Sequence, residues 1–145
     1  MRILTVITLI IVTITIFSGC TSNNPQGRVA VQGEVTLDGK PLAEGNIEFA
    51  SLPGISPAAA TGAVIKNGTF SIPAEFGLIP GQEYLVRFTA QEEIPGTRKK
   101  TDDPLIPDTF DVRNLIPPKW GAESKETVKA TNDSPNKFRF GLANE

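Results

Sequence analysis

Apolar and polar residues alternate along much of the chain after residue 28, with the period of two that is typical of β-strands. The clearest run is 29–37, where apolar residues and Gly33 share one parity and mostly polar residues share the other. This pattern predicts a strand whose apolar set faces a core. Asp38-Gly39 follows and can adopt the positive φ angles of a tight turn. We expect residues 29–49 to form a β-hairpin or near-hairpin, in which Ile47 and Phe49 return inward against the first run.

Five later segments also favour strands, namely 58–66, 69–72, 83–90, 126–131 and 137–142. Asn67-Gly68 marks a second tight turn between two of them. With the two runs of the predicted hairpin, the chain has about seven strands at the spacing of a β-sandwich. No helical period holds over any window after Cys20, and the 12 prolines and 13 glycines favour turns and short strands. The sequence therefore predicts one all-β domain over residues 29–145.

Side-chain parity predicts which residues of the later strands lie in the core. Tyr84 shares its parity with Val86 and Phe88, so we expect it to be buried. A buried tyrosine needs a hydrogen-bond partner, and a backbone carbonyl of the preceding Pro-Gly turn could supply one. In the last strand, the predicted inward set is Phe138, Phe140 and Leu142.

Residues 91–123 break the alternation and are too long for an ordinary connection. Because binding groups concentrate on long loops of rigid scaffolds, this segment is the predicted functional surface, if the domain has one. Its aromatic residues Phe110 and Trp120 could form an exposed platform for a sugar or a peptide. The favoured interpretation is that both cap the open end of the sandwich, because large aromatic residues are usually buried.

The charged residues of this segment suggest two further sites, and a solvated loop is favoured over both. Oxygen ligands for calcium could come from its aspartates, but their spacing does not match an EF-hand loop. A basic run at 98–100 could touch anionic lipid, but it has fewer charges than the clusters of 4–8 expected for lipid recognition. The four aspartates are Asp102, Asp103, Asp108 and Asp111, and the basic run is Arg98-Lys99-Lys100.

The N-terminus has the pattern of a secretory signal. Met1-Arg2 precedes the apolar or threonine residues 3–17, a stretch too short to span a bilayer as a helix. The next residues end at Cys20, the single cysteine of the chain, and Phe17-Ser18-Gly19-Cys20 resembles the lipobox of bacterial lipoproteins, with phenylalanine at the usual leucine position. The resemblance implies a signal peptide at 1–19, lipidation of Cys20 and a membrane anchor. The polar residues 20–28 are the predicted flexible tether.

Composition excludes several classes of function. The chain has no histidine and one cysteine, which excludes Cys/His catalysis, histidine metal sites, zinc fingers and an internal disulfide. Its 14 basic and 16 acidic residues leave a net charge of −2, so we expect no nucleic-acid partner. No nucleophile has an activating motif. The sequence therefore predicts no catalytic residue, no metal and no cofactor.

Four groups of residues along the chain form a series of motifs. They are Gly33 to Leu42 with Gly45 and Ile47, Gly62 with Asn67 to Ile72, Pro80-Gly81 with Tyr84, Val86 and Phe88, and Ile116 to Trp120 with Ser124, Phe138, Phe140 and Leu142. In this order they resemble carboxypeptidase regulatory-like domains, as found in lipoproteins of planctomycete-type bacteria. The resemblance covers most of the mature chain and implies a transthyretin-like, seven-stranded Greek-key β-sandwich without catalytic residues. Glu126 departs from it, because an aliphatic residue usually stands there, so the strand starts later or Glu126 lies at an open edge.

Three functions from different classes remain. The first is a non-enzymatic, lipid-anchored protein of the cell envelope, whose domain has a structural or interaction role. Thr21, rather than aspartate, follows Cys20 and resembles the pattern for export to the outer membrane, facing the periplasm or the cell surface. The second is a receptor domain for a glycan or a peptide, with a site around Phe110 and Trp120. An enzyme is the least favoured.

Overall fold

The computed structural model describes residues 24, 26–103, 105 and 107–143. Cys20 and the predicted signal peptide 1–19 lie outside these residues. In the part of the predicted tether that is described, the side chain of Asn24 accepts a hydrogen bond from the backbone N–H of Arg28 (2.8 Å) and donates one to its carbonyl (2.8 Å). No helix within the described ranges is long and apolar enough to cross a membrane.

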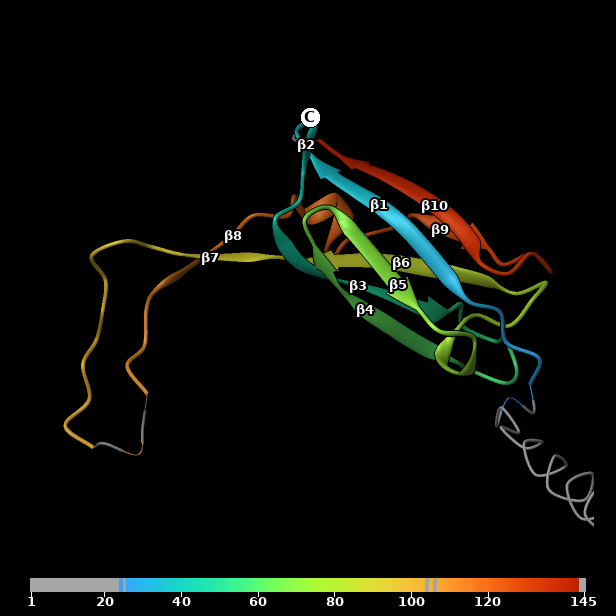
Figure 1. The fold of residues 1–145 in the computed structure, drawn as a ribbon, viewed down its shortest axis with the longest axis horizontal. Helices are drawn as coiled ribbons and strands as arrows, with labels where there is room; N and C mark the ends of the chain where they lie inside the picture. The colour runs from blue at the N-terminus through green and yellow to red at the C-terminus, as the bar shows by residue number, and fades with distance from the viewer. Residues whose placement is uncertain (1–23, 25, 104, 106, 144–145) are drawn as a thin grey trace, which may run out of the picture.

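The described residues form ten strands and two short 3-10 helices, so the predicted all-β class is confirmed (Figure 1). The ten strands exceed the seven expected, because β2, β7 and β8 form where the sequence has no clear alternation. The elements are β1 (Val31–Leu37), β2 (Lys40–Pro41), β3 (Glu44–Ser51), β4 (Ala60–Lys66), β5 (Thr69–Ile72), η1 (Ala74–Phe76), β6 (Glu83–Thr89), β7 (Gln91–Glu93), β8 (Val112–Asn114), η2 (Pro118–Trp120), β9 (Thr127–Lys129) and β10 (Asn136–Leu142).

Eight strands form one curled sheet in the order β10-β1-β5-β4-β3-β6-β9, with β2 also paired to β1. Neighbouring strands β4 and β5 share one registered residue pair, Lys66 and Thr69. Aromatic side chains of strands that are not paired with each other meet in the interior. Phe49 of β3, for example, packs on Phe70 of β5 at a centroid distance of 6.1 Å. The β10-β1-β5 layer therefore faces the β4-β3-β6-β9 layer, and the core lies between them (Figure 1).

The predicted pairing of residues 29–37 with the run that holds Ile47 and Phe49 is wrong. β1 pairs antiparallel with the two-residue β2 and with β5, and it pairs parallel with β10. β3 pairs with β4 and β6 instead. The tight turn itself is correct, since Asp38 and Gly39 both have positive φ. The chain leaves the first layer after β2, and the second run therefore lies in the facing layer rather than beside β1.

The predicted inward parities are confirmed in β1, β5, β6 and β10. The four strands turn their apolar sets inward, and the alternate residues are exposed or, like Thr36, Leu85 and Arg87, half-buried. In β10, Phe138 is partly buried against the core and Phe140 is buried. The ring of Phe140 contacts Phe88 of the facing layer at a centroid distance of 5.1 Å. The most completely buried apolar residues are Val31, Val35, Phe49, Ile65, Leu78, Tyr84 and Val86, each 0% exposed.

Tyr84 is buried as predicted, but the partners of its hydroxyl differ from the prediction. The hydroxyl accepts a hydrogen bond from the backbone N–H of Ile79 (2.9 Å) and donates to Oε1 of Gln82 (3.1 Å). The turn thus supplies a donor, and a side chain of the same turn supplies the acceptor.

Glu126 is exposed and precedes β9, so the strand starts later than the resemblance implies.

Candidate functional site

A two-stranded arm projects from the body of the domain (Figure 1). It begins where β7 and β8 pair antiparallel, with Gln91 opposite Asn114 and Glu93 opposite Val112. Further out, a second bridge joins Lys99 to Thr109, with backbone hydrogen bonds of 2.8 and 3.1 Å. We call residues 91–114 the arm. It occupies most of the segment that the sequence predicts to be one irregular loop.

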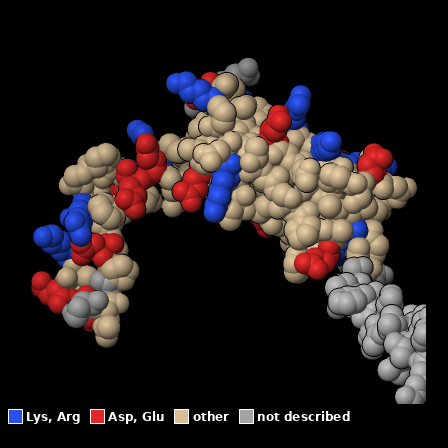
Figure 2. Space-filling model, in the orientation of Figure 1, with Lys and Arg blue, Asp and Glu red and all other residues tan. Residues whose placement is uncertain are grey.

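Three ion pairs connect the two sides of the arm. Arg98 contacts Asp108, with an Nη2–Oδ2 distance of 2.5 Å, and Lys99 contacts Asp111 at 2.6 Å. Arg113 pairs with Glu92 at the base. These side chains are partly or largely exposed, so each pair contributes up to about 1 kcal/mol and mainly keeps the two sides in register. Charges of both signs therefore gather along the arm (Figure 2).

These contacts bear on the two charged sites considered from the sequence. Asp108 and Asp111 are held by basic side chains of the opposite side. Within the described ranges, no group of three or more acidic or cysteine residues could hold a metal ion. Two of the three residues of the basic run, Arg98 and Lys99, are likewise neutralised. Two of the four aspartates and two of the three basic residues are therefore engaged in cross-strand pairs, whereas Asp102, Asp103 and Lys100 are in none of them.

The arm also exposes apolar side chains. Six large apolar residues are exposed in the described part of the chain, and four of them lie on the arm. Leu105 is the extreme case, with 89% of its surface exposed, near the far end. Isolated exposed apolar residues are normal, whereas four on one projection make the arm a candidate interaction surface. The four residues are Ile94 (39%), Leu105 (89%), Phe110 (37%) and Val112 (50%).

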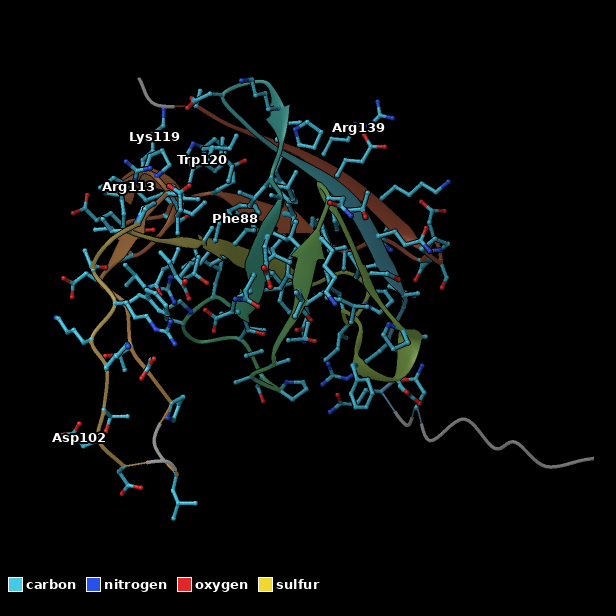
Figure 3. The ribbon with its side chains drawn as sticks, turned by 60° about the vertical axis from the view of Figure 1, so that its left-hand side comes forward. Phe88, Asp102, Arg113, Lys119, Trp120 and Arg139 are labelled. Atoms are coloured by element: carbon cyan, nitrogen blue, oxygen red, sulfur yellow. The ribbon has the colours of Figure 1, made fainter. Side chains whose placement is uncertain are left out.

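The two aromatic residues singled out from the sequence lie in different parts of the structure. Phe110 is on the arm, between the bridge at Thr109 and β8. Trp120 ends η2 and packs on the core, with its ring edge-on to Phe88 at 6.2 Å and 75° (Figure 3). Trp120 therefore packs against the core, as the favoured interpretation expects, whereas Phe110 is 37% exposed on the arm and does not. The two do not form one platform.

Residues 115–124 form a plug that holds Trp120 in place. Ile116 is buried, and the backbone N–H of Leu115 bonds the carbonyl of Ala90 (2.9 Å). The buried hydroxyl of Ser124 donates to the carbonyl of Val86 at 2.6 Å. The predicted 91–123 loop therefore divides into an arm in solvent and a plug on β6. The plug agrees with the interpretation that part of this segment caps the domain, with Ile116 and Trp120 packed inward. The paired form of the arm is the part that the sequence did not indicate.

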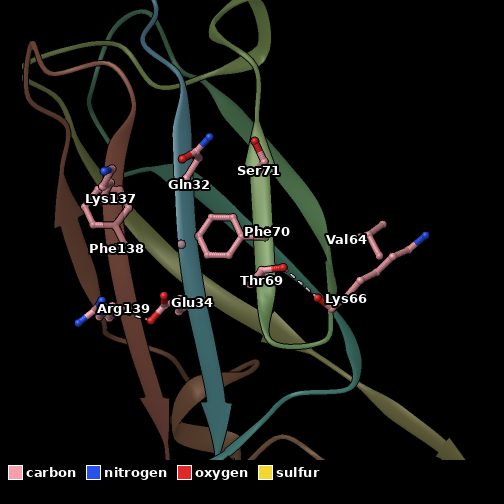
Figure 4. A pocket seen from close by; sticks show the side chains of 11 residues that line it. Gln32, Glu34, Val64, Lys66, Thr69, Phe70, Ser71, Lys137, Phe138 and Arg139 are labelled. Atoms are coloured by element: carbon pink, nitrogen blue, oxygen red, sulfur yellow. Dashed lines mark hydrogen bonds and ion pairs between the residues drawn. The ribbon is translucent and has the colours of Figure 1, made fainter.

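A groove lies over β1, β5 and β10, with β4 at its side (Figure 4). It has a volume of about 760 Å³ and is open to solvent. Its polar lining comes from outward residues of the strands, and Glu34 of β1 forms an ion pair at 3.1 Å with Arg139 of the neighbouring β10. No sequence signal pointed to this groove, because it depends on the pairing of the first strand with the last. Other lining residues are Gln32, Val64, Lys66, Thr69, Lys137 and Phe138.

Comparisons with known proteins add little. No protein-family model matches the chain, and no curated protein matches it. Among solved structures, the crystal structure of a 9R-lipoxygenase from Cyanothece PCC8801 aligns with 96% of this chain and 20% of its own length. The identity is 15% and the TM-score is 0.36, a likeness too weak to carry an argument about fold or function. The chain spans about a fifth of the length of that lipoxygenase.

Proposed function

We propose that this protein is a non-enzymatic, lipid-anchored component of the bacterial cell envelope, located at the outer membrane, and that its arm binds another envelope component. The single observation that carries the interaction role is the arm itself, which exposes four of the six large exposed apolar residues in the described part of the chain. An arm braced by ion pairs presents these residues in a defined arrangement. Binding then costs less conformational entropy than ordering a flexible loop would.

The anchor and the fold family rest on the sequence. The lipobox-like residues at 17–20 support lipidation of Cys20, and the motifs shared with carboxypeptidase regulatory-like domains support a transthyretin-like Greek-key sandwich. Such domains have no catalytic residues, which agrees with the lack of an activating motif in this chain. The alternative, a receptor for a glycan or a peptide, would now place Phe110 in the site without Trp120, since Trp120 packs in the body.

Truncation of the arm tests the interaction role. Ile94 lies opposite Asp111, and its N–H donates to the Asp111 carbonyl at 2.8 Å, so residues 95–110 can be replaced by Asn-Gly, which favours a two-residue hairpin turn. The body and its plug stay intact in this variant. After cross-linking in intact envelopes, we expect the native lipoprotein to have partners and the truncated one to lose them.

A pair of point variants refines the test. Leu105→Ser removes the most exposed apolar side chain of the arm, whereas Phe76→Ser removes one that is 62% exposed on η1, away from the arm. Only the first variant should reduce cross-linking. A truncated protein that folds and keeps every partner would show that the arm is only a connection, and the binding surface would then lie elsewhere on the domain.

Cys20→Ala tests the anchor independently. Each buried methylene contributes about 0.8 kcal/mol to membrane binding, and stable attachment needs more than one chain. Lipoproteins of the kind this chain resembles carry two or three chains, so attachment should be firm. We expect the variant to appear in the soluble or the uncleaved fraction. The same mature size and the same detergent partitioning as the native protein would contradict lipidation.

A further inference from the structure

The arm has an excess of negative charge at its far end. Its residues include six carboxylates and four basic groups, and three cross-strand ion pairs neutralise three of each. Three carboxylates and one ammonium group therefore remain. Asp102 and Asp103 are two of these carboxylates and lie near Leu105, beyond the bridge of Lys99 to Thr109. Lys100 also lies beyond this bridge and Glu93 lies at the base, so the unpaired groups of the far end have a net charge of −1. The far end of the arm thus combines two acidic side chains with the apolar residue that is 89% exposed.

The groove over β1, β5 and β10 has the opposite character. Its lining contains three basic residues and one acid, and the acid, Glu34, is paired with Arg139. Lys66 and Lys137 form no ion pair with any described residue; Glu44 lies opposite Lys66 on β3 but does not line the groove. The lining thus has two more positive than negative charges, whereas the chain as a whole has a net charge of −2.

The groove also offers apolar surface that matches Leu105. Val64 projects into solvent beside Lys66 and is 51% exposed, and Phe138 is partly buried on the other side (Figure 4). A segment with an apolar side chain beside two carboxylates would therefore match both the positive charge and the apolar surface of the groove. The far end of the arm has this composition.

We propose that the far end of the arm of one copy docks in this groove of a second copy. Asp102 and Asp103 then face Lys66 and Lys137, and Leu105 contacts Val64. The contact forms between copies and not within one, because the arm is braced at its base and carries Asp102 away from the body that holds Arg139 (Figure 3). This inference rests on the proposed function, since it names a second copy as a partner of the arm.

Such a contact joins two different surfaces, so each copy keeps a free arm and a free groove for the next. Heterologous contacts of this kind build open chains unless the rotation closes a ring. The contact is small, and small interfaces are weak and transient. Confinement of anchored copies to one membrane raises their effective concentration and favours assembly. Because charge contributes, we expect association to weaken as ionic strength rises.

Site-specific cross-linking in the full-length lipoprotein tests the proposal. Two differently tagged copies are expressed together, and a photoreactive amino acid replaces Leu105 in the first copy only. After illumination, we expect a covalent dimer that contains both tags. Mass spectrometry should map the cross-link on the second copy to β4 or β10, near Val64 or Phe138.

Charge reversal in the second copy provides the sharper readout. Lys66→Glu with Lys137→Glu should lower the yield of the mixed dimer by about tenfold, as expected when two exposed attractions become repulsions. Asp102→Lys with Asp103→Lys in the first copy should restore it. The matched control is Lys40→Glu with Lys125→Glu, which makes the same charge change at exposed lysines outside the groove and should leave the yield unchanged.

The outcomes separate this inference from the function on which it rests. A mixed dimer that is insensitive to the groove charges, or that maps outside the groove, overturns the docking proposal. Leu105 cross-linked to other proteins but never to a second copy also overturns it, while the interaction role of the arm stands. An unchanged urea midpoint for the Lys66 and Lys137 variant confirms that it folds, and restoration by the arm variant gives a second check.

Discussion

Replacing Gly33 with alanine should destabilise the domain, although the change adds a single methyl group. A Cβ at this position would lie 2.4 and 2.5 Å from ring atoms of Phe70 and 2.7 Å from the carbonyl oxygen of Phe138. Favourable carbon contacts need about 3.5–4.0 Å. The Phe70 ring has little room to withdraw, because it packs on Phe49 at 6.1 Å and on Phe140 at 6.4 Å.

The size of the effect follows from these contacts. Overpacking a well-filled core typically costs about 1–3 kcal/mol, and two ring atoms with a backbone oxygen place Gly33→Ala near the upper end. Alanine recovers about 0.4–1 kcal/mol by restricting the unfolded chain. We expect a net loss of about 2 kcal/mol. With an m-value of about 2 kcal/mol per molar, the urea midpoint should fall by about 1 M.

Urea unfolding followed by fluorescence of Trp120, the single tryptophan of the chain, measures this directly. Gly141→Ala in β10 is the matched control, since its added Cβ would lie 3.8 Å from Oγ1 of Thr36, an ordinary contact. Gly33→Ala combined with Phe70→Leu should cost less than the two single changes together. If Gly33→Ala is as stable as Gly141→Ala, the close approach of the ring does not constrain this strand.

Two further predictions concern buried side chains near the C-terminus. Phe140→Ala should cost about 3–5 kcal/mol and lower the melting temperature sharply, whereas Arg139→Ala, on the outer face, should change stability by less than about 0.5 kcal/mol. Equal effects in a thermal melt would contradict the inward placement of Phe140. Asn136 is 3% exposed, and its side chain accepts from the N–H of Thr131 (2.9 Å) and donates to the Thr131 carbonyl (3.2 Å). Asn136→Ala should cost about 1–3 kcal/mol in urea unfolding, and a loss no larger than that of the exposed Asn132→Ala would refute the role of these bonds.

Local patterns predicted the faces of the strands but not their neighbours. The parity of Val31 and Val35 is set by side chains two residues apart, so the sequence is sufficient to find it. The partner of β1 depends on where the chain crosses to the other layer, and the two-residue β2 leaves no local trace of that crossing. Gly33 illustrates the gap. Its parity indicated a core position, but the reason for glycine is the ring of Phe70, opposite it on β5.

The sequence predicted where the exposed segment lies but not the structure that it adopts. The length and charge of residues 91–123 indicated an exposed segment, which agrees with the arm. Both faces of the arm meet solvent, so β7 and β8 need no alternation, and the sequence contained no signal for a ribbon. Phe110 and Trp120 were grouped because they share a segment. They are separated because Trp120 belongs to the plug, in which Ile116 is buried and Trp120 packs on Phe88 of β6.

The parallel pairing of β1 with β10 affects the order in which the domain can form. Val31 pairs with Asn136, which is made 105 residues later. At about 5–20 residues per second, this edge of β1 lacks its partner for roughly 5–20 seconds of synthesis. Contacts so distant in sequence also slow folding, because a long loop must close before they form. This edge of β1 therefore stays unpaired, as a template for other strands, until the seven-residue β10 has been made.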